Sequence, residues 1–204
     1  MPMPTLRLIS SLKSLAGVVL AMALSMPAMA QVSDLTTQYR NGDAAFRLGH
    51  MNAAFGIFTA RCKEGSGYDC FRAGDMYRRA MGTEQDYVAA GEAYAAGCDL
   101  DYADACLALA NMHFTGQGLA EDFPKARALY EDGCDLNDAV SCAVLGNMMY
   151  SGMGGGRDRI MGADLMRRSC LQEVEYACSQ VRRYGLSNKG ERSNTLRRGW
   201  WNGN

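Results

Sequence analysis

Apolar positions along the chain recur with a period of 36 residues, from residue 52 to about residue 184. In each copy a small residue precedes a large apolar residue by four positions, which places both on one face of a helix. The small residues are Ala54, Ala90, Ala126 and Gly162, and the large ones are Phe58, Tyr94, Tyr130 and Met166. Self-similarity at a fixed period of this length predicts an array of stacked repeats.

A second apolar pattern follows a short turn and predicts a second helix in each repeat. It holds Ala73, Leu109, Leu145 and Val181, followed in three copies by Gly74, Ala110 and Gly146. Glycines at 82, 118 and 154 mark a break, and an acid four residues later (Asp86, Asp122 or Asp158) can cap the next helix. In the second copy we expect helices over about 86–98 and 103–114. Because no long stretch alternates like a strand, the predicted fold class is all-α.

The two ends of the array depart from the repeat. Residues 31–50 predict an N-terminal capping helix with a weak point at 41–43, and the array itself is expected over residues 51–185. In the fourth copy Arg182 and Arg183 replace small apolar residues, as expected of a polar terminal cap.

Residues 186–204 predict a disordered basic tail. Four basic residues (Lys189, Arg192, Arg197 and Arg198) outnumber Glu191, and the tail holds both tryptophans of the chain, Trp200 and Trp201. Trp and Arg are frequent interface anchors. Two interpretations stay open, a docking peptide and a poorly ordered end.

The first thirty residues have the pattern of an export signal. Arg7 and Lys13 give a positive start, residues 15–24 are an apolar run, and Ala28-Met29-Ala30 fits a cleavage site. The run is too short for a transmembrane anchor. We therefore expect a mature chain of residues 31–204, with no transmembrane anchor after cleavage, in the periplasm or secreted.

Eight cysteines keep the register of the repeat, in pairs that are eight residues apart and repeat every 36. The first cysteine of a pair ends a helix and the second opens the next, so antiparallel helices can bring the two Cα atoms within about 4.4–6.8 Å. The predicted disulfides are Cys62–Cys70, Cys98–Cys106, Cys134–Cys142 and Cys170–Cys178. Structural zinc is disfavoured because its cysteine pairs usually lie two to four residues apart.

The 36-residue period, the alanine and aromatic columns and the cysteines eight apart resemble the Sel1-like repeat family. More narrowly, they resemble its disulfide-containing branch, the Helicobacter cysteine-rich proteins. The resemblance implies a right-handed α-solenoid of tetratricopeptide type, here with four disulfide-stapled repeats and a concave surface lined by the first helices. It also implies exported proteins that act by binding, although some members of the branch are described as penicillin-binding proteins or β-lactamases.

Charge and catalytic motifs narrow the function further. A formal net charge of −1 argues against a broad nucleic-acid-binding face. The Ser-x-x-Lys motif of serine penicillin-interacting enzymes occurs only at Ser10–Lys13, inside the signal. His50 and His113 are too few for a histidine-rich metal site, and the glycine run at 152–156 lacks the Lys-Ser/Thr of a phosphate loop. We predict no catalytic, cofactor-binding or metal-binding residue.

The sequence therefore favours a non-enzymatic scaffold that binds a protein, a peptide or a cell-wall fragment in a groove, in an oligomeric state that stays open. Candidate groove residues on the first helices are Tyr87, Glu92, Tyr94, Phe123, Arg127 and Tyr130, and the sequence leaves open which of these side chains face the groove and which face the core. Two alternatives remain: a β-lactam hydrolase, implied by the resemblance alone, and a secreted effector that acts on cells of another organism.

Overall fold

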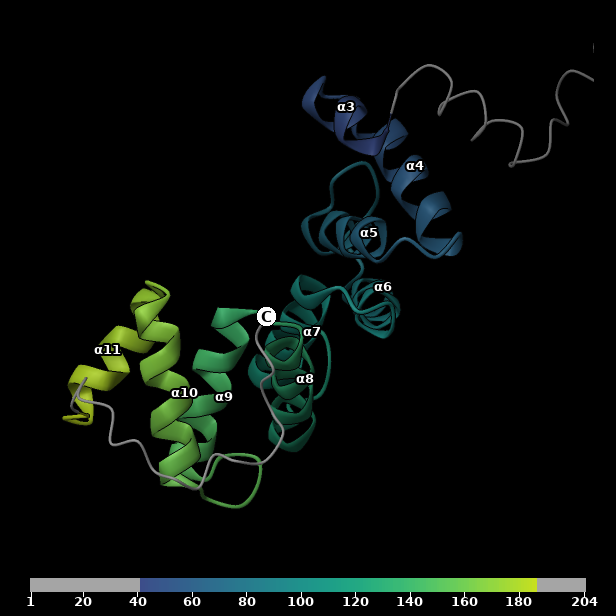
Figure 1. The fold of residues 1–204 in the computed structure, drawn as a ribbon. Helices are drawn as coiled ribbons and strands as arrows, with labels where there is room; N and C mark the ends of the chain where they lie inside the picture. The colour runs from purple at the N-terminus through teal and green to yellow at the C-terminus, as the bar shows by residue number, and fades with distance from the viewer. Residues whose placement is uncertain (1–40, 187–204) are drawn as a thin grey trace, which may run out of the picture.

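The computed structural model describes residues 41–186, which form nine α-helices and no strand (Figure 1). In chain order these are α3 (Gly42–Arg47), α4 (Met51–Lys63), α5 (Gly67–Arg79), α6 (Tyr87–Asp99), α7 (Ala103–Thr115), α8 (Phe123–Asp135), α9 (Ala139–Ser151), α10 (Arg159–Leu171) and α11 (Glu175–Arg183). The predicted signal, the start of the predicted capping helix and nearly all of the predicted basic tail lie outside the described residues. Of the helices between residues 41 and 186, none combines the length and the hydrophobicity that crossing a bilayer requires.

The helices form four hairpins that repeat along the chain, which confirms the predicted solenoid. Repeat 1 is α4 with α5, repeat 2 is α6 with α7, repeat 3 is α8 with α9, and repeat 4 is α10 with α11. Each second helix also packs against the first helix of the next repeat, so the hairpins stack in an elongated, curved row (Figure 1). The buried apolar residues lie in three clusters along this row, and packing between neighbouring helices links each hairpin to the next, as in stacked repeats.

The acids four residues after each break cap the first helices, as predicted. The carboxylates of Asp86, Asp122 and Asp158 accept hydrogen bonds of 2.9 Å from main-chain N–H groups two or three residues into their helices. Asn41 plays the same part for α3 by accepting a 2.9 Å bond from the Ala44 N–H. The expected weak point inside a longer capping helix is thus the N-cap of a six-residue helix.

The predicted breaks at Gly82, Gly118 and Gly154 have a steric cause. Their φ angles are +70°, +73° and +70°, a region that residues with side chains rarely adopt. Each glycine also lies against the start of the first helix of its own repeat, where a Cβ atom would overlap Met51, Tyr87 or Phe123. A glycine is needed here because the linker folds back onto its own hairpin.

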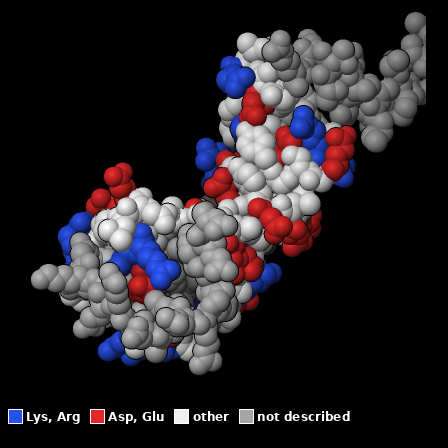
Figure 2. Space-filling model, in the orientation of Figure 1, with Lys and Arg blue, Asp and Glu red and all other residues white. Residues whose placement is uncertain are grey.

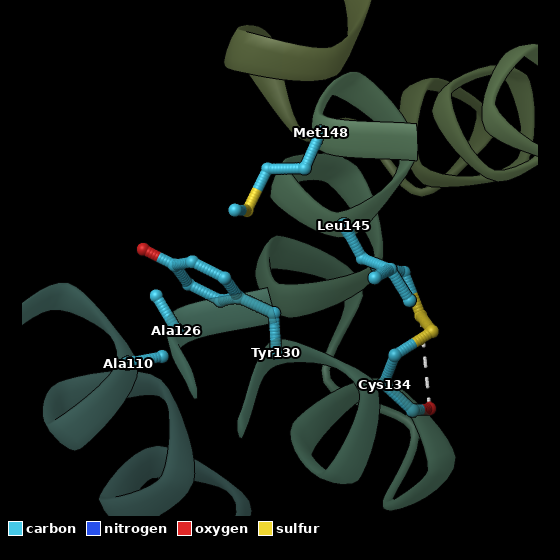
Figure 3. Packing of buried hydrophobic residues seen from close by; sticks show 7 residues of the cluster. Ala110, Ala126, Tyr130, Cys134, Leu145 and Met148 are labelled. Carbon is cyan, nitrogen blue, oxygen red and sulfur yellow. Dashed lines mark hydrogen bonds between the residues drawn. A yellow bond between two sulfur atoms is a disulfide. The ribbon is translucent and has the colours of Figure 1, made fainter. Parts of the chain in front are cut away.

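Large residues of the first helices pack against small residues of the preceding helix. We call the space above each of these small residues a seat. A Cβ atom added to Gly74 would lie 2.6 Å from the ring of Tyr94, and in Figure 3 the Tyr130 ring lies beside Ala110 and Ala126. The same seat pairs Gly42 with Phe58 and Gly146 with Met166. All four large residues are at most 1% exposed. The predicted large residues of the first helices and the predicted small residues of the second helices (Gly74, Ala110 and Gly146) thus meet at the boundaries between repeats.

Each repeat is closed by a disulfide between its two helices. The pairs are Cys62–Cys70, Cys98–Cys106, Cys134–Cys142 and Cys170–Cys178, with S–S distances of 1.95–2.06 Å and Cα–Cα distances of 4.4–4.6 Å. No cysteine of the chain is left free. The second of these positions in repeats 1 and 2, Cys70 and Cys106, is fully buried. The disulfides are therefore part of the core between helices.

Candidate interaction surface

The second helices of repeats 1 to 3 carry a polar residue at a shared position, and each of these residues accepts a hydrogen bond from a tyrosine hydroxyl. Asp75, Asn111 and Asn147 are 36 residues apart, immediately after the small seat residues, and α3 presents Asp43 in the same way. The bonds are Tyr94 to Asp75 (2.9 Å), Tyr130 to Asn111 (2.7 Å), Tyr184 to Asn147 (2.9 Å) and Tyr68 to Asp43 (2.7 Å). A polar column thus runs along the second helices.

Burial explains why Tyr94 and Tyr130 need these partners. Their rings fill the seats between repeats, and a buried hydroxyl without a partner costs free energy. Burial raises the pKa of Tyr94 to about 12 and also raises the pKa of Tyr130. Both hydroxyls therefore stay neutral and donate across the boundary between repeats.

The terminal repeats obtain the same bond from another position. Phe58 and Met166 fill the large-residue column there and have no hydroxyl. In repeat 1 the donor is Tyr68, from the second helix. In repeat 4 the donor to Asn147 is Tyr184, which directly follows α11, while Tyr176, the residue equivalent to Tyr68, accepts a 2.9 Å hydrogen bond from the Asn147 amide. This polar column was not among the residues predicted from the sequence, although its 36-residue spacing was the available signal.

A hollow of about 300 Å³ opens beside Tyr94, between the second helices α5 and α7. Its apolar lining comes from Phe71, Leu107, Ala108 and Met112. Its polar lining comes from Asp75, Arg78, Arg79, Asp104, Asn111 and Gln117. This volume is at the low end of the usual range for ligand pockets, about 300–1,000 Å³, and suits a single side chain.

The charges inside the hollow are partly paired with one another. Asp75 forms ion pairs with Arg78 (2.9 Å) and Arg79 (3.8 Å), and Arg78 also donates to the Tyr94 oxygen at 3.2 Å. Asn111 is exposed, and its carbonyl oxygen is taken by Tyr130. Among the described residues, nothing accepts a hydrogen bond from the Asn111 NH₂ group, so it can donate to a ligand.

The six predicted groove residues do not form one groove. Of the six, only Tyr94 lines the hollow. Tyr130 is buried in the seat on Ala110, and Phe123 packs edge-on against Phe114 with ring centroids 5.4 Å apart. Tyr130 therefore faces the core between repeats and not a groove, while Phe123 is partly buried against α7.

The other three candidates lie at separate places. Arg127 donates a 2.9 Å hydrogen bond to the Gly156 carbonyl and so holds the linker after repeat 3. The Tyr87 hydroxyl accepts from Gln85 at 3.1 Å, and Glu92 is exposed on α6. The hollow is therefore bordered mainly by second helices, and the expectation that the first helices line a binding groove stays a prediction.

Within residues 41–186, the hydrogen bonds of the serine hydroxyls and of His113 show no arrangement for nucleophilic catalysis. Among residues 41–186, serine hydroxyls that donate hydrogen bonds do so to Asp69 or to main-chain carbonyls, and none is bonded to a basic side chain that could activate it. His113 is 8% exposed, with Nδ1 3.4 Å from the Ala120 carbonyl oxygen, and it packs inside repeat 2. Nor does any group of three or more His, Cys, Asp or Glu within these residues have an arrangement that could hold a metal ion.

Comparison with known proteins places the fold in a class. No protein-family model matches the sequence, and no curated protein does. Solved structures match with TM-scores above 0.5, and all three described below are repeat or cysteine-rich proteins. The chain has the Sel1-like repeat fold, as the sequence predicted.

Three structures illustrate the likeness. A Sel1 repeat protein from Oxalobacter formigenes has a TM-score of 0.58 and 20% identity over 62% of this chain and 95% of its own. A protective antigen of uropathogenic Escherichia coli displaying an SLR fold has a TM-score of 0.63 and 22% identity over 74% of this chain, which matches only 35% of the antigen. Helicobacter pylori cysteine rich protein B has a TM-score of 0.51 and 20% identity over 64% of this chain and 94% of its own.

Proposed function

We propose that this protein is an extracytoplasmic interaction scaffold that binds a peptide segment of a partner protein in the hollow between α5 and α7. The observation that carries the proposal is the hollow itself. It combines an apolar lining with the Asn111 NH₂ group, which has no acceptor among the described residues. An exposed amide donor can bond a main-chain carbonyl of an extended peptide while the apolar lining receives a side chain.

The disulfides support a location outside the cytoplasm. Four disulfides in one chain are typical of oxidising compartments and rare in the reducing cytosol. An export signal over residues 1–30 fits this location, and the mature chain would then be periplasmic or secreted. The domain boundaries at residues 30, 50 and 185 remain predictions.

A peptide is a better-supported ligand than the other classes considered. A cell-wall fragment or an effector role has no contact or charge pattern among residues 41–186 in its favour, and a β-lactam hydrolase would need an activated nucleophile. The hollow offers donors, an acidic rim residue and apolar contacts but no such nucleophile.

Site-specific photo-crosslinking in the native cell tests the proposal. A photoreactive residue at Ala108, which lines the hollow, is compared with one at Ala128, which is exposed on α8 outside it. We expect a protein adduct from position 108 that is absent from position 128 and weakened by Asn111→Ala. No adduct at 108, or the same adducts from both positions, would overturn the proposal.

A further inference from the structure

Repeat 2 is strongly acidic and carries no positive side chain. Residues 80–124 contain eight acids and neither Lys nor Arg. The acids are Glu84, Asp86, Glu92, Asp99, Asp101, Asp104, Glu121 and Asp122. All except Asp122 are exposed, and none takes part in the ion pairs found within residues 41–186. Figure 2 shows acidic side chains gathered over α6.

The negative field continues into repeat 3. Burial, together with repulsion from Asp135 and Asp99, raises the pKa of Asp132 on α8. Asp99 of repeat 2 is therefore close enough to Asp132 of repeat 3 to disfavour the charged form of Asp132. A cationic segment laid across this surface would relieve that repulsion.

The chain itself contains such a segment after the last described residue. Residues 187–204 hold four basic residues and one acid, with Arg197 and Arg198 next to Trp200 and Trp201. Fourteen residues lead from Leu186 to Trp200. An extended chain of that length can reach about 46–50 Å.

This reach is sufficient for repeat 2. Four successive helix contacts lead from α11 back to α7, through α10, α9 and α8. Packed helices lie about 8–10 Å apart, so the two helices are separated by at most about 40 Å between axes. The segment can therefore lie along repeats 3 and 2 without a second copy of the chain.

We propose that residues 187–204 dock on repeat 2 of the same chain, with a tryptophan in the hollow and Arg197 and Arg198 on the acidic surface. Phe71, Leu107 and Met112 give the indole ring an apolar wall, and Asp104 brings negative charge to the edge of the hollow. Trp and Arg combine large buried area with charge and are the commonest anchors of such contacts. The docking itself does not depend on the proposed function. Only its consequence, competition between residues 187–204 and the partner peptide, rests on that proposal.

Tryptophan fluorescence of the full mature chain tests the docking directly, because Trp200 and Trp201 are the only tryptophans. We expect a blue-shifted emission and weak quenching by acrylamide compared with a synthetic peptide of residues 187–204. Asp104→Arg should shift the emission to the red and raise the quenching constant severalfold, as should high salt. The matched control Glu64→Arg makes the same change of charge at an exposed residue of repeat 1, outside both the acidic surface and the hollow, and it should have a much smaller effect.

Three results would overturn the inference. They are quenching in the wild type equal to that of the free peptide, equal effects of Asp104→Arg and Glu64→Arg, and protection that disappears on dilution and so needs a second copy. This measurement uses purified protein without a partner. A failure here therefore leaves the crosslinking test of the proposed function unaffected, and a failed crosslink leaves the docking result standing.

Discussion

The Tyr94 hydroxyl donates a 2.9 Å hydrogen bond to Asp75 and so ties the first helix of repeat 2 to the second helix of repeat 1. The ring fills the seat above Gly74 while the hydroxyl reaches the hollow between α5 and α7. One residue thus stabilises the stack and shapes the candidate binding surface. The same geometry recurs one repeat later with Tyr130 and Asn111, at 2.7 Å.

Removing the Tyr94 hydroxyl should destabilise the protein without disturbing the seat. Tyr94→Phe leaves Asp75 with Arg78 and Arg79 but deletes one hydrogen bond to a charged group, which costs about 1.5–3 kcal/mol. Urea unfolding under oxidising conditions measures the loss. Tyr77→Phe is the matched control because the Tyr77 ring packs edge-on against Phe55 and no residue among 41–186 bonds its hydroxyl. Equal losses in the two variants would contradict the assignment.

Stability should fall at alkaline pH because of the same tyrosine. The pKa of Tyr94 is raised by burial from 10.0 to about 12 in the folded protein. Its contribution to stability is therefore complete below pH 10 and is lost as the pH rises towards about 12, where the folded protein also releases the proton. The free energy of unfolding, measured across this range, should decrease less steeply in Tyr94→Phe than in the wild type. An unchanged slope would show that Tyr94 ionises normally.

Exchanging Ala80 for glycine should stabilise the protein. Ala80 ends α5 in the left-handed conformation with φ of +56°, and the equivalent ends of α7 and α9 are Gly116 and Gly152. The left-handed conformation costs a residue with a Cβ atom about 1–2 kcal/mol. Glycine avoids this cost but loses more conformational entropy on folding, which offsets part of the gain. We expect a net gain of about 0.5–1 kcal/mol for Ala80→Gly in urea unfolding. Gly116→Ala should lose a similar amount, and a loss in both variants would refute the explanation.

Features set by spacing along the chain were predictable, and features set by stacking were not. The cysteine pairs and the caps at Asp86, Asp122 and Asp158 each involve residues at most eight positions apart, so the repeat fixed their partners. Helical spacing also placed Tyr94 and Tyr130 on one face, but it could not say whether that face met solvent or the next repeat. The hollow lies between α5 and α7, which belong to different hairpins. Its lining therefore depends on how the repeats stack.

The four disulfides should contribute nearly equal amounts to stability. Each closes a loop of the same length, with partners separated by eight residues, and the loop-entropy estimate is about 2.5 kcal/mol for each. Removing a pair by Cys98→Ala with Cys106→Ala should therefore cost about as much as removing the pair at 170 and 178. Because Cys106 is fully buried and Cys178 is partly exposed, any excess loss at repeat 2 measures packing rather than loop closure. Urea unfolding of the two double variants separates these contributions, and losses near zero at both sites would show that helix packing alone holds the hairpins closed.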